Sequence, residues 1–309
     1  MKSYFSPEFN RNYGFWNEDE QRLLMSSRVA IGGVGGDGYQ LGLKLARMGV
    51  SAFNVADPEV FERENANRVP GATNSTYGRL KASVFADEVH DINPDADVEI
   101  FTDGVTPENA DDFVHNADLV FDETELTYLA VGTALARAAR KHDIPDVMVM
   151  NIGFAAQITS FNPRSRYTFE KFMGIPKEMP LDEVSEMTVD LARCVPYIPS
   201  YGDIDTLRSV EGGASLPSIA QGVDIASAIG ASQGLLHLVK GKNNRREPVW
   251  APRIAYIDAY NLSSGITRFP RSSHYRHLAL MAVRGAMGKN PKASYSEDDI
   301  LRRELLAKK

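Results

Sequence analysis

The feature that most constrains the fold of this chain is a glycine-rich loop at residues 33–38, with the sequence GVGGDG. The apolar run at residues 28–31 leads into the loop and predicts a buried strand, and residues 39–48 follow it with apolar side chains at helical spacing. A second strand is expected at residues 52–56, and Asp57 comes directly after it. The order strand, glycine loop, helix, strand, acid is typical of the first βαβ unit of a nucleotide-binding fold.

Helix and strand patterns keep alternating after this unit. Helices are expected at residues 18–26, 81–92, 107–114 and 130–141, and strands at residues 97–101, 119–121, 147–150 and 156–161. A long apolar helix is expected at residues 222–239, and two late strands at residues 253–258 and 265–269. The pattern favours an α/β fold: a Rossmann-like, doubly wound, mostly parallel sheet with helices on both faces, extended by late antiparallel strands.

The domain organisation follows from where this alternation stops. Residues 1–161 are expected to form the nucleotide-binding part. Residues 162–216, rich in proline, glycine and acids, predict an irregular crossover or substrate loop. Residues 217–288 would complete the same domain with the long helix and late strands, and residues 289–309 form a charged tail.

Composition excludes several classes of protein. A net charge of −7 argues against broad nucleic-acid binding, although it leaves room for a local basic patch. Cys194 is the only cysteine, so no disulfide within the chain and no zinc site built from CxxC pairs is expected. No apolar stretch predicts a signal peptide or a membrane span, so we expect a cytoplasmic protein without membrane contact.

The loop alone does not choose the nucleotide. Backbone N–H groups at Gly33, Gly35, Gly36 and Gly38 suit the phosphates of NAD, FAD or ATP equally well. Asp57 lies 24 positions after Gly33, a spacing that favours a contact with a ribose hydroxyl. Up to this point an NAD-dependent enzyme is the default interpretation.

The residues after Asp57 change that default. They include Asp57-Pro-Glu59-Val60, then Asn65-Ala-Asn67-Arg68, then Lys81, which lies 13 positions past Arg68. Asn10-Arg11 precedes the first strand, and Asp122-Glu-Thr124 follows the fourth. In this ordered set the chain resembles the E1-like adenylating family: ubiquitin-type activating enzymes, the ThiF- and MoeB-type activators of sulfur carriers, and tRNA threonylcarbamoyladenosine dehydratases. The resemblance covers roughly residues 10–165 and 209–241.

The resemblance implies that ATP and Mg²⁺ activate a carboxylate, which attacks the α-phosphate and expels pyrophosphate. Cations must then be aimed at the phosphates. By resemblance, Arg68 and Lys81 supply two of them, and Arg11 supplies a third by reaching into the active site of the neighbouring subunit of a homodimer.

The resemblance also implies roles for polar residues around the nucleotide. Asp57 would hold the ribose, with Glu59 beside it, and Asn65 would contribute polar orientation. Asp122 would hold Mg²⁺, since hard oxygen ligands suit that ion.

The chain departs from the family most clearly in its cysteines. Many members carry a cysteine that accepts the acyl group as a thioester, whereas Ser209 stands at the expected position here and Cys194 lies upstream of it. A serine hydroxyl is scarcely ionised without an activating base. We therefore expect an enzyme that stops at the acyl-adenylate or passes it to another nucleophile. The zinc-binding cysteine pairs of many relatives are absent too, so no zinc is expected.

The leading hypothesis is an ATP-dependent adenylyltransferase acting on the carboxylate of a peptide, a small protein or another substrate. A tRNA threonylcarbamoyladenosine dehydratase-like cyclase that acts on tRNA is the main alternative. An NAD-dependent oxidoreductase and a non-catalytic scaffold are weaker ones. Asp37 is the unusual residue of the loop, because an acid there would repel phosphates. Its side chain is expected to point away from the nucleotide, towards solvent or a partner.

Overall fold

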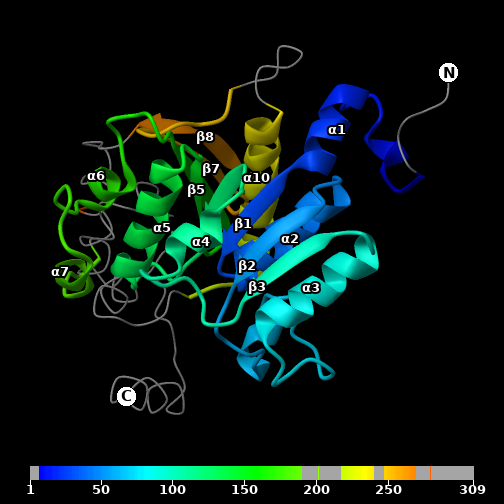
Figure 1. Cartoon of the computed structure of the whole chain (residues 1–309), viewed down its shortest axis with the longest axis horizontal. Helices are drawn as coiled ribbons and strands as arrows, with labels where there is room; N and C mark the ends of the chain where they lie inside the picture. The colour runs from blue at the N-terminus through cyan, green and yellow to red at the C-terminus, as the bar shows by residue number, and fades with distance from the viewer. Residues whose placement is uncertain (1–6, 190–200, 202–216, 240–246, 269–278, 280–309) are drawn as a thin grey trace.

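The computed structural model describes residues 7–189, 201, 217–239, 247–268 and 279, and its centre is one eight-stranded sheet (Figure 1). The strands lie in the order β3-β2-β1-β4-β5-β6-β7-β8. Their bounds are β1 Arg28–Gly32, β2 Ala52–Ala56, β3 Asp97–Phe101, β4 Leu119–Asp122, β5 Asp146–Ile152, β6 Ala155–Phe161, β7 Arg253–Asp258 and β8 Ser263–Arg268.

The sheet has a parallel half and an antiparallel half. Strands β3, β2, β1, β4 and β5 pair in parallel, with Gly32 of β1 aligned with both Ala56 of β2 and Asp122 of β4. From β5 onward each strand pairs antiparallel with the next. The predicted fold class is therefore confirmed, including the late antiparallel strands. Because β1, β2 and β4 end side by side, the residues that follow them meet at one edge of the sheet.

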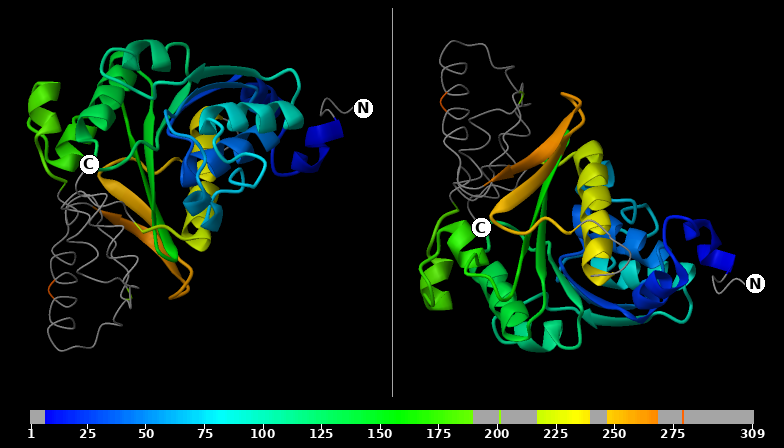
Figure 2. Two further views of the ribbon diagram at one scale, coloured as in Figure 1. Left: turned by 90° about the horizontal axis from the view of Figure 1, so that it is seen from below. Right: turned by 90° about the horizontal axis from the view of Figure 1, so that it is seen from above.

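Helices cover both faces of the sheet, as the edge-on views of Figure 2 show. The longer helices are α1 Glu18–Ser26, α2 Gly36–Arg47, α3 Lys81–Ile92, α5 Leu129–Lys141 and α10 Ala220–Leu238, with the short α4 Ala110–Val114 beside α5. Helices α2, α3 and α10 share one face, and α4 and α5 the other.

Helix α10 packs unusually closely because it carries glycines on its sheet-facing side. A Cβ atom added at Gly234 would lie 2.7 Å from the ring of Phe121, and one at Gly230 would lie 3.0 Å from Val149. The helix therefore seals β4 and β5 from solvent on that face.

Among the described residues, no helix is both long and apolar enough to cross a membrane.

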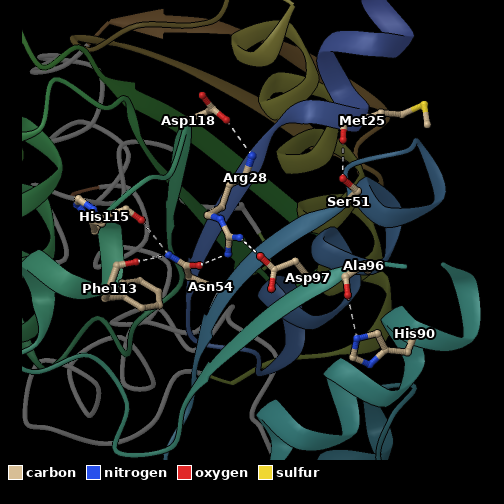
Figure 3. Close-up of polar contacts among 10 residues, drawn as sticks. All are labelled: Met25, Arg28, Ser51, Asn54, His90, Ala96, Asp97, Phe113, His115 and Asp118. Atoms are coloured by element: carbon tan, nitrogen blue, oxygen red, sulfur yellow. Dashed lines mark hydrogen bonds and ion pairs between the residues drawn. The ribbon is translucent and has the colours of Figure 1, made fainter. Parts of the chain in front are cut away.

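A polar network ties together the opposite edge of the sheet, where the parallel strands begin (Figure 3). Arg28 donates from its backbone N–H to Asp118 (2.8 Å) and from its guanidinium to Asn54 (2.8 Å) and Asp97. The side-chain amide of Asn54 donates to the carbonyl of Phe113 at 2.7 Å. These contacts hold β1, β2, β3 and the end of α4 in register far from the edge where the loops gather.

The elements differ from expectation in a few places. Helix α2 begins at Gly36, three residues early, and α4 begins at Ala110, three residues late. The stretch expected to be irregular contains two short helices, α6 Phe169–Met173 and α7 Leu181–Ser185. Cys194, Ser209 and the charged tail at 289–309 lie outside the described residues.

Candidate nucleotide site

A cavity of about 380 Å³ opens at the carboxyl ends of β1, β2, β4 and β5. This volume lies within the range usual for small-molecule sites. Eight of the residues expected to hold the nucleotide line it: Gly33, Gly35, Gly36, Gly38, Asp57, Glu59, Arg68 and Lys81. The structure thus gathers in one place residues that are up to 48 positions apart along the chain.

The glycine loop is shaped by close backbone contacts. Gly33 has a φ of +112°, and a Cβ atom there would lie 2.2 Å from the carbonyl oxygen of Glu123. A Cβ atom at Gly38 would lie 2.0 Å from the carbonyl oxygen of Gly33. At Gly35, directly before α2, an added Cβ would meet nothing within 4 Å. Gly33 and Gly38 are therefore required by the fold, whereas Gly35 leaves open the space in which a phosphate could approach the helix N-terminus.

Asp57 holds this loop through its carboxylate. It is 5% exposed; one oxygen accepts the N–H of Val34 at 3.0 Å, and the other accepts the N–H of Glu59 at 2.9 Å. Burial raises the pKa of Asp57, and the nearby Lys81 opposes that shift. Asp57 therefore shapes the phosphate loop as well as lining the cavity, and its contact with a ribose stays a prediction.

The two cations reach the cavity from the segment after β2. Lys81 begins α3, is 6% exposed and forms an ion pair with Glu59. Arg68 follows the short helix η2 Arg63–Asn67, and its guanidinium donates to the carbonyl of Glu64 (3.1 Å) and to Asn67 (2.9 Å). Both side chains stand where they could meet anionic groups of a ligand.

Asn65 does not line the cavity but supports Arg68. Its side-chain oxygen accepts the N–H of Glu62 at 3.0 Å, and its carbonyl accepts the N–H of Arg68 at 3.1 Å. The side chain is buried, so it fixes the turn that presents Arg68 to the cavity.

Asp122 does not line this cavity but a smaller one of about 40 Å³ beside it, and the two cavities share Thr124 and Glu125 as lining residues. It is 4% exposed, and one of its oxygens accepts the hydroxyl (2.6 Å) and the N–H (3.2 Å) of Thr124. The other oxygen faces α5, 3.1 Å from where a Cβ would stand on Gly132. Glu125, which is exposed, lines the cavity instead. The carboxylate of Asp122 is therefore positioned to order the loop after β4, and its role as a Mg²⁺ ligand stays a prediction.

Arg11 lies apart from the cavity in its own chain. It belongs to the short helix η1 Pro7–Asn12 and is exposed. Figure 1 shows this segment beside α1, on the side of the molecule where the N-terminus lies. Its expected reach into the active site of a neighbouring subunit stays a prediction.

Asp37 contradicts the expectation that its side chain points to solvent or a partner. It is 8% exposed and lines the cavity, and its Oδ2 accepts the side-chain amide of Asn151 at 2.9 Å. Burial raises the pKa of Asp37 to about 7, while the hydrogen bond from Asn151 lowers it. The predicted orientation of Asp37 was wrong because its partner, Asn151, is 114 positions away, and no local sequence pattern reveals such a contact.

Glu123 is a second cavity residue that the sequence did not single out. It lies between Asp122 and Thr124, so it sits inside a motif that had already been recognised. Its pKa is raised well above the ordinary value, mainly by burial and next by the nearby carboxyl of Asp37. Two acids therefore stand close together beside the loop where phosphates would bind.

A hydrogen-bonded chain connects these acids to other parts of the wall. Asn67 donates from its side-chain amide to the carbonyl of Ser218 at 3.0 Å, and the hydroxyl of Ser218 donates to Asn151 at 2.9 Å. Asn151 in turn donates to Asp37. Ser218, which leads into α10, is thereby connected to Asp37 of the glycine loop on one side and to Asn67, the residue before Arg68, on the other.

Known proteins share this arrangement of sequence and fold. Residues 9–277 match the ThiF family. The chain belongs to the ThiF family.

Relatives in the ThiF family have several functions. A stretch of 108 residues is 32% identical to the tRNA threonylcarbamoyladenosine dehydratase of Haemophilus influenzae, covering 35% of this chain and 41% of that protein. A stretch of 145 residues is 29% identical to the sulfur carrier protein ThiS adenylyltransferase of Escherichia coli, covering 47% and 57%. The chain thus spans less than two thirds of the length of both relatives.

Solved structures share the fold over most of the chain. Escherichia coli MccB, crystallised with ATP, matches with a TM-score of 0.60 at 16% identity, covering 82% of this chain and 67% of that one. The structure of MccB with MccA-N7isoASN has the same TM-score at 17% identity. At this level of identity the likeness concerns the fold alone.

Proposed function

We propose that this ThiF-family protein is an ATP-dependent adenylating enzyme that converts a substrate carboxylate into an acyl-adenylate without a cysteine thioester. The observation that carries the proposal is the meeting of the glycine loop, Asp57, Arg68 and Lys81 in one cavity. Family membership supports ATP over NAD as the nucleotide, because the ThiS adenylyltransferase is a relative and MccB was crystallised with ATP.

For this reaction the protein needs mainly to position the two substrates and to stabilise negative charge. A carboxylate is already ionised at neutral pH, so one of its oxygens can attack the α-phosphorus directly. The bond between that phosphorus and the oxygen bridging to the β-phosphate breaks, and pyrophosphate leaves with the electron pair. Arg68 and Lys81 would stabilise the negative charge that builds up on the phosphate oxygens, while N–H groups at the start of α2 would hold them.

Magnesium fits the acids of this cavity. Glu59 and Glu125 are exposed carboxylates that line it from the loops after β2 and β4, and they are the hard oxygen donors that the ion prefers. They would hold Mg²⁺ beside the phosphates, where the ion supplies further positive charge. Asp122 orders Thr124 beside them, and the direct contact with Mg²⁺ that the resemblance implies for Asp122 stays a prediction.

We propose a peptide or small-protein carboxylate as the substrate, supported by the structures of MccB with the MccA peptide. The specific observation that favours the alternative, a tRNA-modifying cyclase, is the 32% identity to a tRNA threonylcarbamoyladenosine dehydratase. The net charge of −7 weighs against it, since tRNA binding needs cations along the phosphate backbone.

Exchange of labelled pyrophosphate into ATP tests the proposal, with a panel of peptides and tRNA as carboxylate sources. Arg68→Ala and Lys81→Ala are each expected to lower the exchange rate by about 100-fold or more. Arg79→Ala is the matched control, because Arg79 follows Arg68 in the same segment but pairs with Asp87 at the surface. Exchange that survives in Arg68→Ala would refute this site.

The absence of a thioester has its own test. Incubation with ATP and the substrate, followed by denaturation without reductant, should leave no acyl group on the protein. A thioester trapped on Cys194 would refute this part of the proposal while leaving the adenylation step standing.

A further inference from the structure

Asp37 and Glu123 form a pair of acids that the adenylation chemistry above does not use. Asp37 lies in the first turn of α2, and Glu123 directly follows β4. The Cβ of Glu123 lies 3.2 Å from where a Cβ would stand on Gly38 and 3.4 Å from one on Gly33. Glu123 is therefore packed against both ends of the glycine loop, next to Asp37.

One oxygen of each acid is buried without a hydrogen-bond partner among the described residues: Oδ1 of Asp37 and Oε1 of Glu123. Asp37 is held by Asn151 through its other oxygen, and Asn151 is held in turn by Ser218. The orientation of Asp37 is thus fixed before any ligand arrives. Both oxygens are shut off from solvent, and buried polar atoms left without a partner are costly, so a water molecule or an ion is expected to meet them.

The charges of the cavity point to a cation. Among the described residues that line it, six are acidic: Asp37, Asp57, Glu59, Asp103, Glu123 and Glu125. Two are basic, and one of these, Lys81, is already paired with Glu59. Triphosphate bound at the start of α2 would add further negative charge directly beside Asp37. A cation between the acids and the phosphates removes that repulsion.

We propose that Asp37 and Glu123 form a binding site for a divalent metal ion at the phosphate end of the cavity, separate from any ion held by Glu59 and Glu125. A small hard cation such as Mg²⁺ is commonly bound by one or two carboxylates and completes its shell with water and phosphate oxygens. The site consists of this chain's own side chains, so it exists whether or not the proposed adenylation is correct.

Binding of Mn²⁺ alone to the full-length protein, without nucleotide, tests the site. Paramagnetic resonance of free Mn²⁺ gives the number of bound ions and their Kd, which is expected to be about 1 mM or tighter for a site with two carboxylates. Asp37→Asn and Glu123→Gln should each weaken one bound ion at least tenfold. Asp103→Asn, which removes an exposed acid from the same cavity, should leave that ion unchanged.

The Mn²⁺ measurements distinguish a metal site at Asp37 and Glu123 from its absence. Asparagine at position 37 keeps an acceptor for Asn151, so this variant is expected to fold and decides the question even if Glu123→Gln does not. Unchanged Mn²⁺ stoichiometry and Kd in Asp37→Asn would overturn the proposal, and so would a wild-type protein that binds no Mn²⁺ up to 10-fold above the expected Kd of about 1 mM. Failure of pyrophosphate exchange would bear on the proposed reaction and leave the metal result unaffected.

Discussion

Replacing Asp57 with asparagine should destabilise the glycine loop before it affects any ligand. The carboxylate accepts two backbone N–H groups, from Val34 at 3.0 Å and from Glu59 at 2.9 Å. Asparagine keeps one acceptor oxygen and turns an amide group, which only donates, towards the other N–H. One hydrogen bond to a charged group is lost, which costs about 1.5–3 kcal/mol. Alanine loses both bonds and should cost more than asparagine.

Urea denaturation of the nucleotide-free protein measures this cost as a lower midpoint. Glu59→Gln is the matched control, because that side chain is 70% exposed and its ion pair with Lys81 is expected to contribute about 0–1 kcal/mol. Calorimetric titration with ATP should show weaker binding in Asp57→Asn, since the loop loses the contact that fixes Val34. A variant that unfolds at the wild-type urea concentration would refute the role assigned to Asp57.

Three further predictions concern backbone space and buried charge. Gly33→Ala places a Cβ 2.2 Å from a backbone carbonyl at a φ of +112° and should cost about 3 kcal/mol or more, whereas Gly35→Ala meets no atom and should keep the thermal midpoint but lose ATP affinity. Gly234→Ala crowds the ring of Phe121 at 2.7 Å and should cost about 1–3 kcal/mol in urea denaturation. Burial raises the pKa of Asp146 well above its ordinary value, and neither carboxyl oxygen has a hydrogen-bond partner among the described residues. The protonated acid therefore stabilises the fold below about pH 4, and this contribution is lost as pH rises towards the folded-state pKa. Asp146→Asn should accordingly be more stable than wild type at pH 8 by about 1–3 kcal/mol and no more stable at pH 4, and a difference that does not depend on pH would refute this reading.

The parallel half of the sheet was predictable because its signals are local. Residues 52–56, 81–92 and 97–101 were assigned with their observed bounds from apolar periodicity alone. Helix α2 begins earlier than predicted because its first turn is made of glycines and an acid, which carry no apolar pattern. The short helix α6 was missed although it has a capping residue, Thr168, because five residues are too few to show a helical period.

The candidate site was predictable as a set of residues but not as a set of orientations. The spacing shared with the family predicted one site for Asp57, Arg68 and Lys81, and the three residues do line one cavity. It did not reveal that the carboxylate of Asp122 turns towards Thr124, because that depends on the packing of α5 behind it. Nor did it reveal that Asp37 is buried, because the hydrogen bond from Asn151 comes from a strand more than a hundred positions away.

The hydrogen-bonded chain from Asn67 through Ser218 and Asn151 to Asp37 connects the two ends of the cavity, so we expect binding at one end to affect the other. If a cation binds at Asp37 more tightly when Asn151 is held in place, then by reciprocity the cation must also favour the arrangement of Ser218 and Asn67 that holds it. Asn67 also accepts a hydrogen bond from the guanidinium of Arg68. Cation binding at the glycine loop and the orientation of the Arg68 guanidinium would then be coupled. The coupling free energy between substitutions at positions 37 and 67 would measure this dependence.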